Sequence, residues 1–376
     1  MELTIATATL KQGVGQVQRA VASRSTLPVL GLIRMVVTES EVRLTGSDLD
    51  LTIEWTGSPD LVKMPGELCI PGRLLAEYLG LLPDGTVDLK AKGTELHVKA
   101  GDRTAVFQGM PPAEFPPPPV WKSPAAFTVP ASVLARGAEE AGFAVSGDPS
   151  SPVLAGVSLA ASHDTLVFAA TDRHRLAEAQ VAIAGVGPKK DIKVIVPGSH
   201  LQIAVRLMGA SSDVAIKIDQ QHVAFARPGL TVTSRLIAGV FPNYQQVIPV
   251  ETSTSVIVSR ADLQRELALA SVVTASGAGT HPIEVIVAKS GVTLRGDASE
   301  IGQTTGAVTG TLTGVAETTY ANGRYLLDAV NAVSDEQVEL AFNGPQQPIS
   351  VRPVGRQDFV ALVMPVSVPK VVSRAA

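Results

Sequence analysis

The sequence has almost no cysteine and no long apolar segment. Its one cysteine, Cys69, excludes an intramolecular disulfide and a cysteine-rich metal site, and we expect it to be a small buried hydrophobe. No uncharged apolar stretch is long enough for a membrane-spanning helix, and the amino-terminal residues MELTIATATLKQG lack the pattern of a signal peptide. We therefore expect a folded cytoplasmic protein with no membrane association.

An excess of positive charge is also missing. The 376 residues include 31 Lys and Arg against 35 Asp and Glu, a formal net charge of −4. This balance argues against a generally basic nucleic-acid coat, although a local basic surface is compatible with it. With 45% hydrophobic and 18% charged residues, the chain has enough apolar side chains for a core and too few charges for a disordered protein.

Motifs for catalysis are absent as well. The chain has no serine nucleophile elbow, no phosphate-binding loop and no His, Cys or Asp spacing typical of a metal site. Asp172, His174 and Arg175 could form an acid–base cluster, but the same spacing suits a structural hydrogen bond. We favour the structural interpretation and expect no enzyme, no cofactor and no metal.

What the sequence does contain is an internal repeat. Three segments, beginning at Leu3, Phe127 and Val256, each open with a short alternating strand and continue as an amphipathic helix. The apolar residues at helical spacing are Leu10, Val14, Val17 and Val21 in the first segment, Leu134, Ala138, Ala141 and Val145 in the second, and Leu263, Leu267 and Ala270 in the third. Each copy is predicted to begin with a strand and a helix.

The rest of the unit repeats in the same order. A proline introduces a strand pair in each copy, and the same number of residues separates Pro28 from Pro152 as separates Val42 from Leu166 in the strands that follow. A glycine-containing helix start, an apolar helix and an alternating strand then recur in three segments, which begin at Ile70, Val196 and Ala321. The chain is therefore predicted to be a triplicated unit of about 125 residues.

These repeats define three predicted domains, each with two helices packed on antiparallel sheets, so that the fold class is α+β. Their bounds are residues 1–124, 125–250 and 251–376. The first boundary lies in the proline-rich stretch FPPPPVWKSP, which favours a stiff extended connector. Residues 369–376 are expected to form a flexible tail.

Three similar domains in series leave two unlike ends, which a second copy can satisfy by symmetric dimerisation. Twelve helices at a spacing of about 8–10 Å would line a hole of about 100–120 Å perimeter, which admits a DNA duplex. The cations expected to face this hole are Lys11, Arg19, Arg24, Arg73, Arg136 and Arg206. Because acidic residues on the same helices nearly balance them, we expect loose phosphate contacts that are independent of base sequence.

Several separated motifs resemble a known family. The segments ATDRHRLA from Ala170, TSRLIAGVFPNYQQVIP from Thr233, NGRYLLDAV from Asn322 and LVMPV from Leu362 are similar, in this order, to motifs of the bacterial DNA polymerase III beta subunit, the sliding clamp. The resemblance extends over nearly the whole chain. It implies a non-catalytic, head-to-tail homodimeric ring that encircles double-stranded DNA, is loaded by an ATP-driven clamp loader and tethers the DNA polymerase III catalytic subunit for processive synthesis.

The resemblance also implies a hydrophobic pocket for short peptide motifs of polymerases, the clamp loader, mismatch-repair proteins and ligase. Carried over by motif, the pocket would use Leu154, Thr171, His174, Arg175, Leu176, Pro242, Val247, Asn322, Tyr325, Leu362, Val363, Met364, Pro365 and Val366. We further expect the dimer interface to join a strand of the first domain to a helix of the third. The residues expected there are Thr104, Val106, Phe107, Val272 and Val273.

The chain departs from the family pattern at three positions near the predicted pocket. Arg173 stands where the family usually has glycine. The family usually has an arginine or a similar cation near the position of Gln246, and often has a basic residue at the position of Ser367. A divergent accessory clamp is therefore one alternative, and a triplicated β-rich enzyme or ligand-binding protein is another. Sedimentation distinguishes the clamp from the latter, because a clamp is a dimer without a cofactor.

Overall fold

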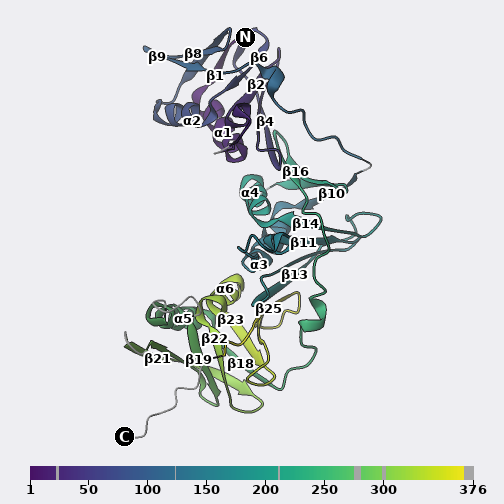
Figure 1. Ribbon diagram of the computed structural model, residues 1–376, viewed down its shortest axis with the longest axis vertical. Helices are drawn as coiled ribbons and strands as arrows, with labels where there is room; N and C mark the ends of the chain where they lie inside the picture. The colour runs from purple at the N-terminus through teal and green to yellow at the C-terminus, as the bar shows by residue number, and fades with distance from the viewer. Residues whose placement is uncertain (23–24, 123, 211, 275–280, 299–301, 368–376) are drawn as a thin grey trace. The chain divides into compact units, whose positions relative to one another are not determined.

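The computed structural model describes most of the chain. The described residues are 1–22, 25–122, 124–210, 212–274, 281–298 and 302–367, so the predicted tail 369–376 lies outside them. They group into two compact units, Met1–Leu134 with Ser199–Leu236, and Ala135–Gly198 with Ile237–Ala376 (Figure 1). The central repeat thus contributes to both units.

The first unit contains two antiparallel sheets. Their strands are β1 (Glu2–Ala6), β2 (Ile33–Val37), β3 (Val42–Ser47), β4 (Leu51–Gly57), β5 (Leu61–Met64), β6 (Gly66–Ile70), β7 (Thr86–Lys92), β8 (Glu95–Ala100), β9 (Arg103–Gln108), β10 (Ala125–Pro130), β15 (Asp213–Ile218), β16 (His222–Arg227) and β17 (Leu230–Arg235). One sheet follows the order β5-β1-β7-β8-β9 and the other β10-β15-β16-β17-β4-β3-β2-β6. Because β17 pairs with β4, placing Val232 opposite Ile53, strands of the first two repeats form one continuous sheet.

Two helices of the first unit, α1 (Thr7–Val17) and α2 (Gly72–Leu81), belong to the first repeat. The apolar face of α1 is buried as predicted, and a Cβ atom at Gly13 would overlap the Trp55 ring, so this helix packs directly on β4. The prediction that the helix continues to Val21 is wrong. A 3-10 turn, closed by the Val21 N–H donating to Gln18 O at 3.1 Å, follows α1 and ends the helix, and Val21 itself has extended backbone.

The second unit contains one long antiparallel sheet. Its strands are β11 (Gly156–Ala161), β12 (Thr165–Thr171), β13 (Arg175–Ala182), β14 (Ile192–Pro197), β18 (Thr254–Ser259), β19 (Pro282–Ala288), β20 (Gly291–Ala298), β21 (Gly302–Thr313), β22 (Glu317–Asn322), β23 (Gln337–Phe342), β24 (Ile349–Pro353) and β25 (Phe359–Val363). Their order is β14-β11-β12-β13-β25-β24-β23-β18-β21-β20-β19-β22. The pairing of β13 with β25, with Leu176 opposite Leu362, joins the second repeat to the third.

The remaining helices are α3 (Ala131–Gly142), α4 (Gly198–Met208), α5 (Arg260–Thr274) and α6 (Gly323–Ala332). Helix α6 begins after Asn322, whose side-chain oxygen accepts the N–H groups of Arg324 and Tyr325 at 3.0 and 3.2 Å, as expected for an N-cap. Helix α3 ends at Gly142, before the predicted Val145, because a tight turn follows it. On α5 the predicted apolar residues are buried.

The predicted fold class is confirmed: each repeat contributes a strand–helix start and a second helix, and all the strand pairs are antiparallel. Cys69 is fully buried on β6, and burial raises the pKa of its thiol to about 11. The prediction of a small buried hydrophobe at this position is therefore confirmed. Within the described residues, no helix is both long and apolar enough to cross a membrane.

Candidate functional site

An apolar pocket of about 260 Å³ opens in the second unit, beside the pairing of β13 with β25. The residues that border it are Leu154, Thr171, Arg173, Arg175, Leu176, Pro242, Asn243, Tyr244, Val247, Leu362 and Met364. Most of its exposed lining is apolar, so a ligand would bind here mainly by burying apolar surface.

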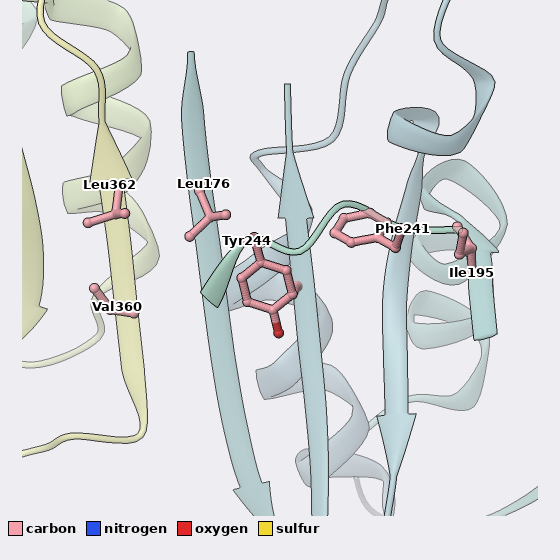
Figure 2. Packing of buried hydrophobic residues seen from close by; sticks show 7 residues of the cluster. Leu176, Ile195, Phe241, Tyr244, Val360 and Leu362 are labelled. Atoms are coloured by element: carbon pink, nitrogen blue, oxygen red, sulfur yellow. The ribbon is translucent and has the colours of Figure 1, made fainter. Parts of the chain in front are cut away.

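A buried hydrophobic cluster supports the pocket from below. Leu176 on β13 and Leu362 on β25 are 6% and 1% exposed, and Phe241 and Tyr244 pack beside them with their rings edge to face at 6.0 Å. Figure 2 shows Leu176 on β13 and Leu362 on β25, with Phe241 and Tyr244 on the segment that follows β17. Burial and the neighbouring Glu178 carboxylate raise the pKa of Tyr244, so its hydroxyl stays protonated.

The segment from Pro242 to Val247 forms one wall of the pocket. Tyr244 N–H donates to Pro242 O at 2.9 Å and Val247 N–H donates to Tyr244 O at 3.0 Å, which folds the segment into a tight turn and a short 3-10 helix, η5 (Gln245–Val247). Val247 is 48% exposed as a result. This wall therefore presents an apolar side chain at the mouth of the pocket.

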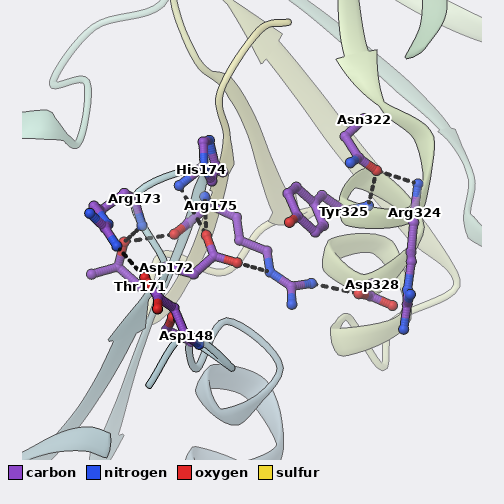
Figure 3. A network of polar contacts seen from close by, with 11 residues as sticks. Asp148, Thr171, Asp172, Arg173, His174, Arg175, Asn322, Arg324, Tyr325 and Asp328 are labelled. Carbon is purple, nitrogen blue, oxygen red and sulfur yellow. Dashed lines mark hydrogen bonds and ion pairs between the residues drawn. The ribbon is translucent and has the colours of Figure 1, made fainter. Parts of the chain in front are cut away.

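The turn between β12 and β13 forms the opposite wall (Figure 3). The Thr171 hydroxyl donates to Arg175 O at 2.7 Å and accepts the Arg173 N–H at 3.2 Å. Asp172 Oδ1 accepts the N–H groups of His174 and Arg175, each at 2.9 Å. Asp172 is therefore a turn-forming residue, which supports the structural interpretation of the Asp172–His174 pair.

Arg175 is the central polar side chain of this region. It is only 12% exposed, and it donates from Nε to Asp172 Oδ2 at 3.0 Å and from Nη1 to Asp328 Oδ2 at 2.5 Å. Its guanidinium also lies 4.4 Å from the centre of the Tyr325 ring. These contacts fix the position of the β12–β13 turn relative to α6, and they leave Arg175 little freedom to bind a ligand charge.

The structure brings many of the predicted pocket residues to the border of the cavity. Those residues are Leu154, Thr171, Arg175, Leu176, Pro242, Val247, Leu362 and Met364. Other predicted residues do not border it, namely His174, Asn322, Tyr325, Val363, Pro365 and Val366.

The residues in this second group support the surrounding framework. The His174 ring stacks on Tyr325, with ring centres 6.5 Å apart, and Asn322 caps α6. Val363 is fully buried, and the chain beyond it is held by the bridge of Pro365 to Ala321. Val363 does not border the cavity although Leu362 does, because successive residues of β25 point to opposite faces of the sheet.

Three residues that border the pocket were missed. Tyr244 and Asn243 lie within the FPNYQQV segment that supplied two predicted residues, and Arg173 lies within the TDRHR turn. Periodicity does not predict which way a side chain points from a turn. The only sequence signal for these three residues was that they lie between neighbours already predicted to border the pocket.

A second polar network in this unit involves Arg136, one of the predicted DNA-contacting residues. Arg136 Nε donates to Glu140 Oε1 at 3.2 Å, and the Arg136 guanidinium also pairs with Asp358. Arg356 joins the same group through Glu140 at 2.9 Å, Asp358 at 2.9 Å and Asp335 at 2.8 Å. The network ties α3 of the second repeat to loops of the third.

The other predicted DNA-contacting cations lie in the first unit, except Arg24, which is outside the described residues. Lys11 on α1 is exposed, and its ammonium donates to Gly80 O at 3.3 Å. Arg73 on α2 is 86% exposed and pairs with Glu77. Arg19 and Arg206 are also exposed, Arg19 after α1 and Arg206 in the last turn of α4.

The predicted interface residues lie on an outer strand and on an exposed helix face. Thr104, Val106 and Phe107 belong to β9, which is the last strand of its sheet, and Val106 is 55% exposed. On α5, Val272 is 73% exposed and Val273 is half-buried. Among the residues that the structure describes, no group of His, Cys, Asp and Glu side chains could hold a metal ion.

Repeats of strands and paired helices give the chain the architecture of a clamp-type protein. Family models of the DNA polymerase III beta subunit match the chain in order, with the N-terminal domain on residues 1–119, the central domain on 128–243 and the C-terminal domain on 245–367. The chain is 30% identical over 363 residues to the beta sliding clamp of Synechococcus elongatus, covering 95% of this chain and 96% of that protein. It is 26% identical to the beta sliding clamp of Bacillus subtilis, covering 97% and 99%.

Solved structures agree with these sequence matches. The Bacillus subtilis DNA polymerase sliding clamp matches with a TM-score of 0.93 at 25% identity, over 98% of this chain and 100% of that chain. A Pseudomonas aeruginosa sliding clamp bound to griselimycin matches with a TM-score of 0.92 at 27% identity, with the same coverage. The chain therefore belongs to the DNA polymerase III beta subunit family, the sliding clamps, which are non-catalytic factors of processive DNA replication.

Proposed function

We propose that the chain forms a head-to-tail homodimeric ring around double-stranded DNA and tethers the DNA polymerase III catalytic subunit in the cytoplasm. The observation that carries this proposal is the full-length match to beta sliding clamps, with all three family domains in order. A clamp loader would open and close the ring. The domains would be residues 1–124, 125–250 and 251–376.

Two open strand edges support the proposed dimer interface. Among the strands that the structure describes, β9 pairs only with β8. Residues 302–309 of β21 pair only with β20, because the pairing with β18 covers the stretch from Gly310 to Thr313. Edges of unlike sequence can complete each other across two chains, and the exposed Val106 and Val272 would be buried there.

The proposed DNA contacts are few and independent of base sequence. Lys11, Arg19, Arg73 and Arg206 are exposed cations on or beside helices, and Arg24 completes the set that we propose. Arg136 instead shares its charge with two carboxylates, so we assign it a bracing role. A small number of phosphate contacts suits a ring that must slide along the duplex.

The pocket is proposed to hold an extended peptide segment of a partner protein. An apolar side chain of the peptide would bury surface against Leu176, Val247 and Met364, at about 25 cal/mol per Å² before ordering costs. The unbranched Met364 can adapt to peptides of different shape. Partners of this kind would be the polymerase, the clamp loader, repair polymerases, mismatch-repair proteins and ligase.

Sedimentation equilibrium of the full chain tests the proposed assembly. The parent should sediment as a dimer, and Val272→Asp should sediment as a monomer because it places a charge in the proposed interface. Val250→Asp is the matched control, since Val250 is 99% exposed in the same unit and is not part of the proposed contact. A monomeric parent would contradict the ring, and a dimeric Val272→Asp variant would contradict this interface.

A further inference from the structure

We propose that Arg173 gives the pocket a preference for peptides that carry an acidic side chain next to their apolar anchors. This inference rests on the proposed role of the pocket as a peptide site. Arg173 borders the pocket at the turn between β12 and β13.

The backbone at Arg173 does not favour an arginine. Its φ angle is +77°, in the left-handed region that glycine adopts freely and that L side chains disfavour. The turn is held by the Thr171 hydroxyl and the Asp172 carboxylate, so the Arg173 side chain is not needed to form it. The turn therefore does not require a charged side chain at this position, and the role of Arg173 depends on what its guanidinium contacts.

The guanidinium of Arg173 is held in place but only partly used. Its Nη2 donates to Asp148 Oδ2 at 2.8 Å and to Ser151 Oγ at 3.1 Å, and the side chain is 60% exposed. Nε and Nη1 form no hydrogen bond with any residue that the structure describes. Because a guanidinium has five N–H donors in a fixed fork, three donors remain for a ligand carboxylate.

No other positive charge on the pocket border can take this role. Arg175 is the second cation there, but both of its edges are occupied by Asp172 and Asp328. Gln246, next to the pocket residue Val247, is neutral. A peptide whose apolar anchors occupy the pocket would therefore place a neighbouring acidic side chain beside Arg173.

The gain in affinity expected from an acidic side chain of the peptide is moderate. Asp148 already neutralises part of the Arg173 charge, and the site is exposed enough for water and salt to screen it. Exposed charge pairs of this kind change affinity by about two- to fivefold, with the larger value at low salt. The apolar anchors would still supply most of the affinity.

Fluorescence anisotropy with matched peptides tests the proposal on the full chain. The peptides are acetylated, C-terminally amidated pentapeptides with a Leu-Phe pair and one Asp placed either before or after it, each with an Asn counterpart. We expect the parent to bind at least one Asp peptide about two- to fivefold more tightly than its Asn counterpart, with the difference shrinking as salt rises. In Arg173→Gln this preference should vanish, so that each Asp peptide binds no more tightly than its Asn counterpart.

Arg295→Gln is the matched control, because Arg295 is 56% exposed and pairs with Glu284 at 3.5 Å in the same unit, without bordering the pocket. It should keep the preference of the parent. Equal affinity for the Asp and Asn peptides, or a preference that survives in Arg173→Gln, would overturn the inference and leave the pocket assignment intact. Failure of all four peptides to bind the parent would instead contradict the pocket assignment itself.

Discussion

Two turns of the molecule share one local design. In the β3–β4 turn of the first unit, Ser47 Oγ accepts the Leu49 N–H at 3.2 Å, and Asp48 Oδ1 accepts the two N–H groups that follow. Leu49 has a φ angle of 80°. In the β12–β13 turn of the second unit, Thr171 and Asp172 make the same contacts and Arg173 has the same conformation.

The surroundings of these turns differ. Beside the first turn, Asp50 and Arg235 lie 3.8 Å apart and are 63% and 66% exposed. Beside the second, Arg175 is 12% exposed and binds two carboxylates at the border of the pocket. The pocket is therefore not a property of the turn. It arises because β25 and the segment from Pro242 to Val247 pack against this one turn.

Removing the arginine beside each turn should give the largest difference between the two regions, measured as the loss in the free energy of unfolding. Arg175→Ala leaves Asp172 and Asp328 without their cation and should lower the free energy of unfolding of the second unit by about 3 kcal/mol. Arg235→Ala should lower that of the first unit by less than about 1 kcal/mol, because its pair is exposed.

Urea unfolding can measure the two units separately. Both tryptophans, Trp55 and Trp121, belong to the first unit, so their fluorescence follows that unit, while circular dichroism follows both. Arg175→Ala should shift the circular dichroism transition and leave the fluorescence transition in place. Equal stability losses for the two variants would contradict the role assigned to burial.

Truncating apolar side chains should affect peptide binding at the pocket and not at the β3–β4 turn. Leu176→Ala with Met364→Ala should weaken the binding of a polymerase-derived peptide by about 100-fold, because the pocket loses the apolar surface of two of its lining side chains. Leu49→Ala removes a 54% exposed leucine from the matching turn and should leave affinity unchanged. Titration at a temperature below the melting transition of every variant measures this. Unchanged affinity in the double variant would remove the pocket assignment.

Acid should weaken the second unit through the Arg136 network. Burial alone would raise the pKa of Asp358, but hydrogen bonds from Arg136 and Arg356 outweigh it and lower the pKa below the usual range. A lowered pKa in the folded state contributes stability above the unfolded value of about 3.9, and this contribution is lost as the pH falls through the folded value.

The variant Asp358→Asn isolates this contribution. It should be less stable than the parent near neutral pH, and the difference should shrink as the pH falls below about 4. Urea midpoints between pH 7 and pH 3 give the comparison. A difference that stays constant over this interval would show that the Asp358 carboxylate does not titrate with the network.

Glycine at the strained turn positions should have the smallest effect. Leu49→Gly relieves a left-handed backbone and should raise the free energy of unfolding by at most about 1 kcal/mol, since glycine also gains freedom in the unfolded state. Arg173→Gly gains the same relief but loses the contacts to Asp148 and Ser151, so it should be close to neutral. A larger gain for Arg173→Gly than for Leu49→Gly would contradict this account.

The repeating elements could be predicted from the sequence because each one has a local pattern. Alternation and helical spacing identified the six helices and the strand–helix order, since a buried face requires a fixed period. The ends of α1 and α3 were placed too late, at Val21 and Val145. Both valines extend the apolar period, but each lies beyond a tight turn that the period does not encode.

Contacts between distant residues could not be predicted in this way. Arg136 was expected to face DNA with acidic residues of its own helix nearby, but its second partner, Asp358, lies in another repeat and could not be predicted from helical spacing. The resemblance identified the strands and segments that border the pocket, but Val363 and Tyr325 belong to the supporting framework, and Arg173 and Tyr244 line the cavity. Which side of a strand or turn faces a cavity depends on packing between repeats.

The most direct test of the central claim, that the chain acts as a ring on DNA, is retention on circular and linear duplexes. The chain is loaded onto a nicked circle by a clamp loader, separated from free protein at moderate salt, and then followed after the circle is cut. We expect it to persist on the circle and to leave after linearisation, because few phosphate contacts hold it and free ends let a ring slide off. Equal retention on the circular and the linear DNA would contradict the account.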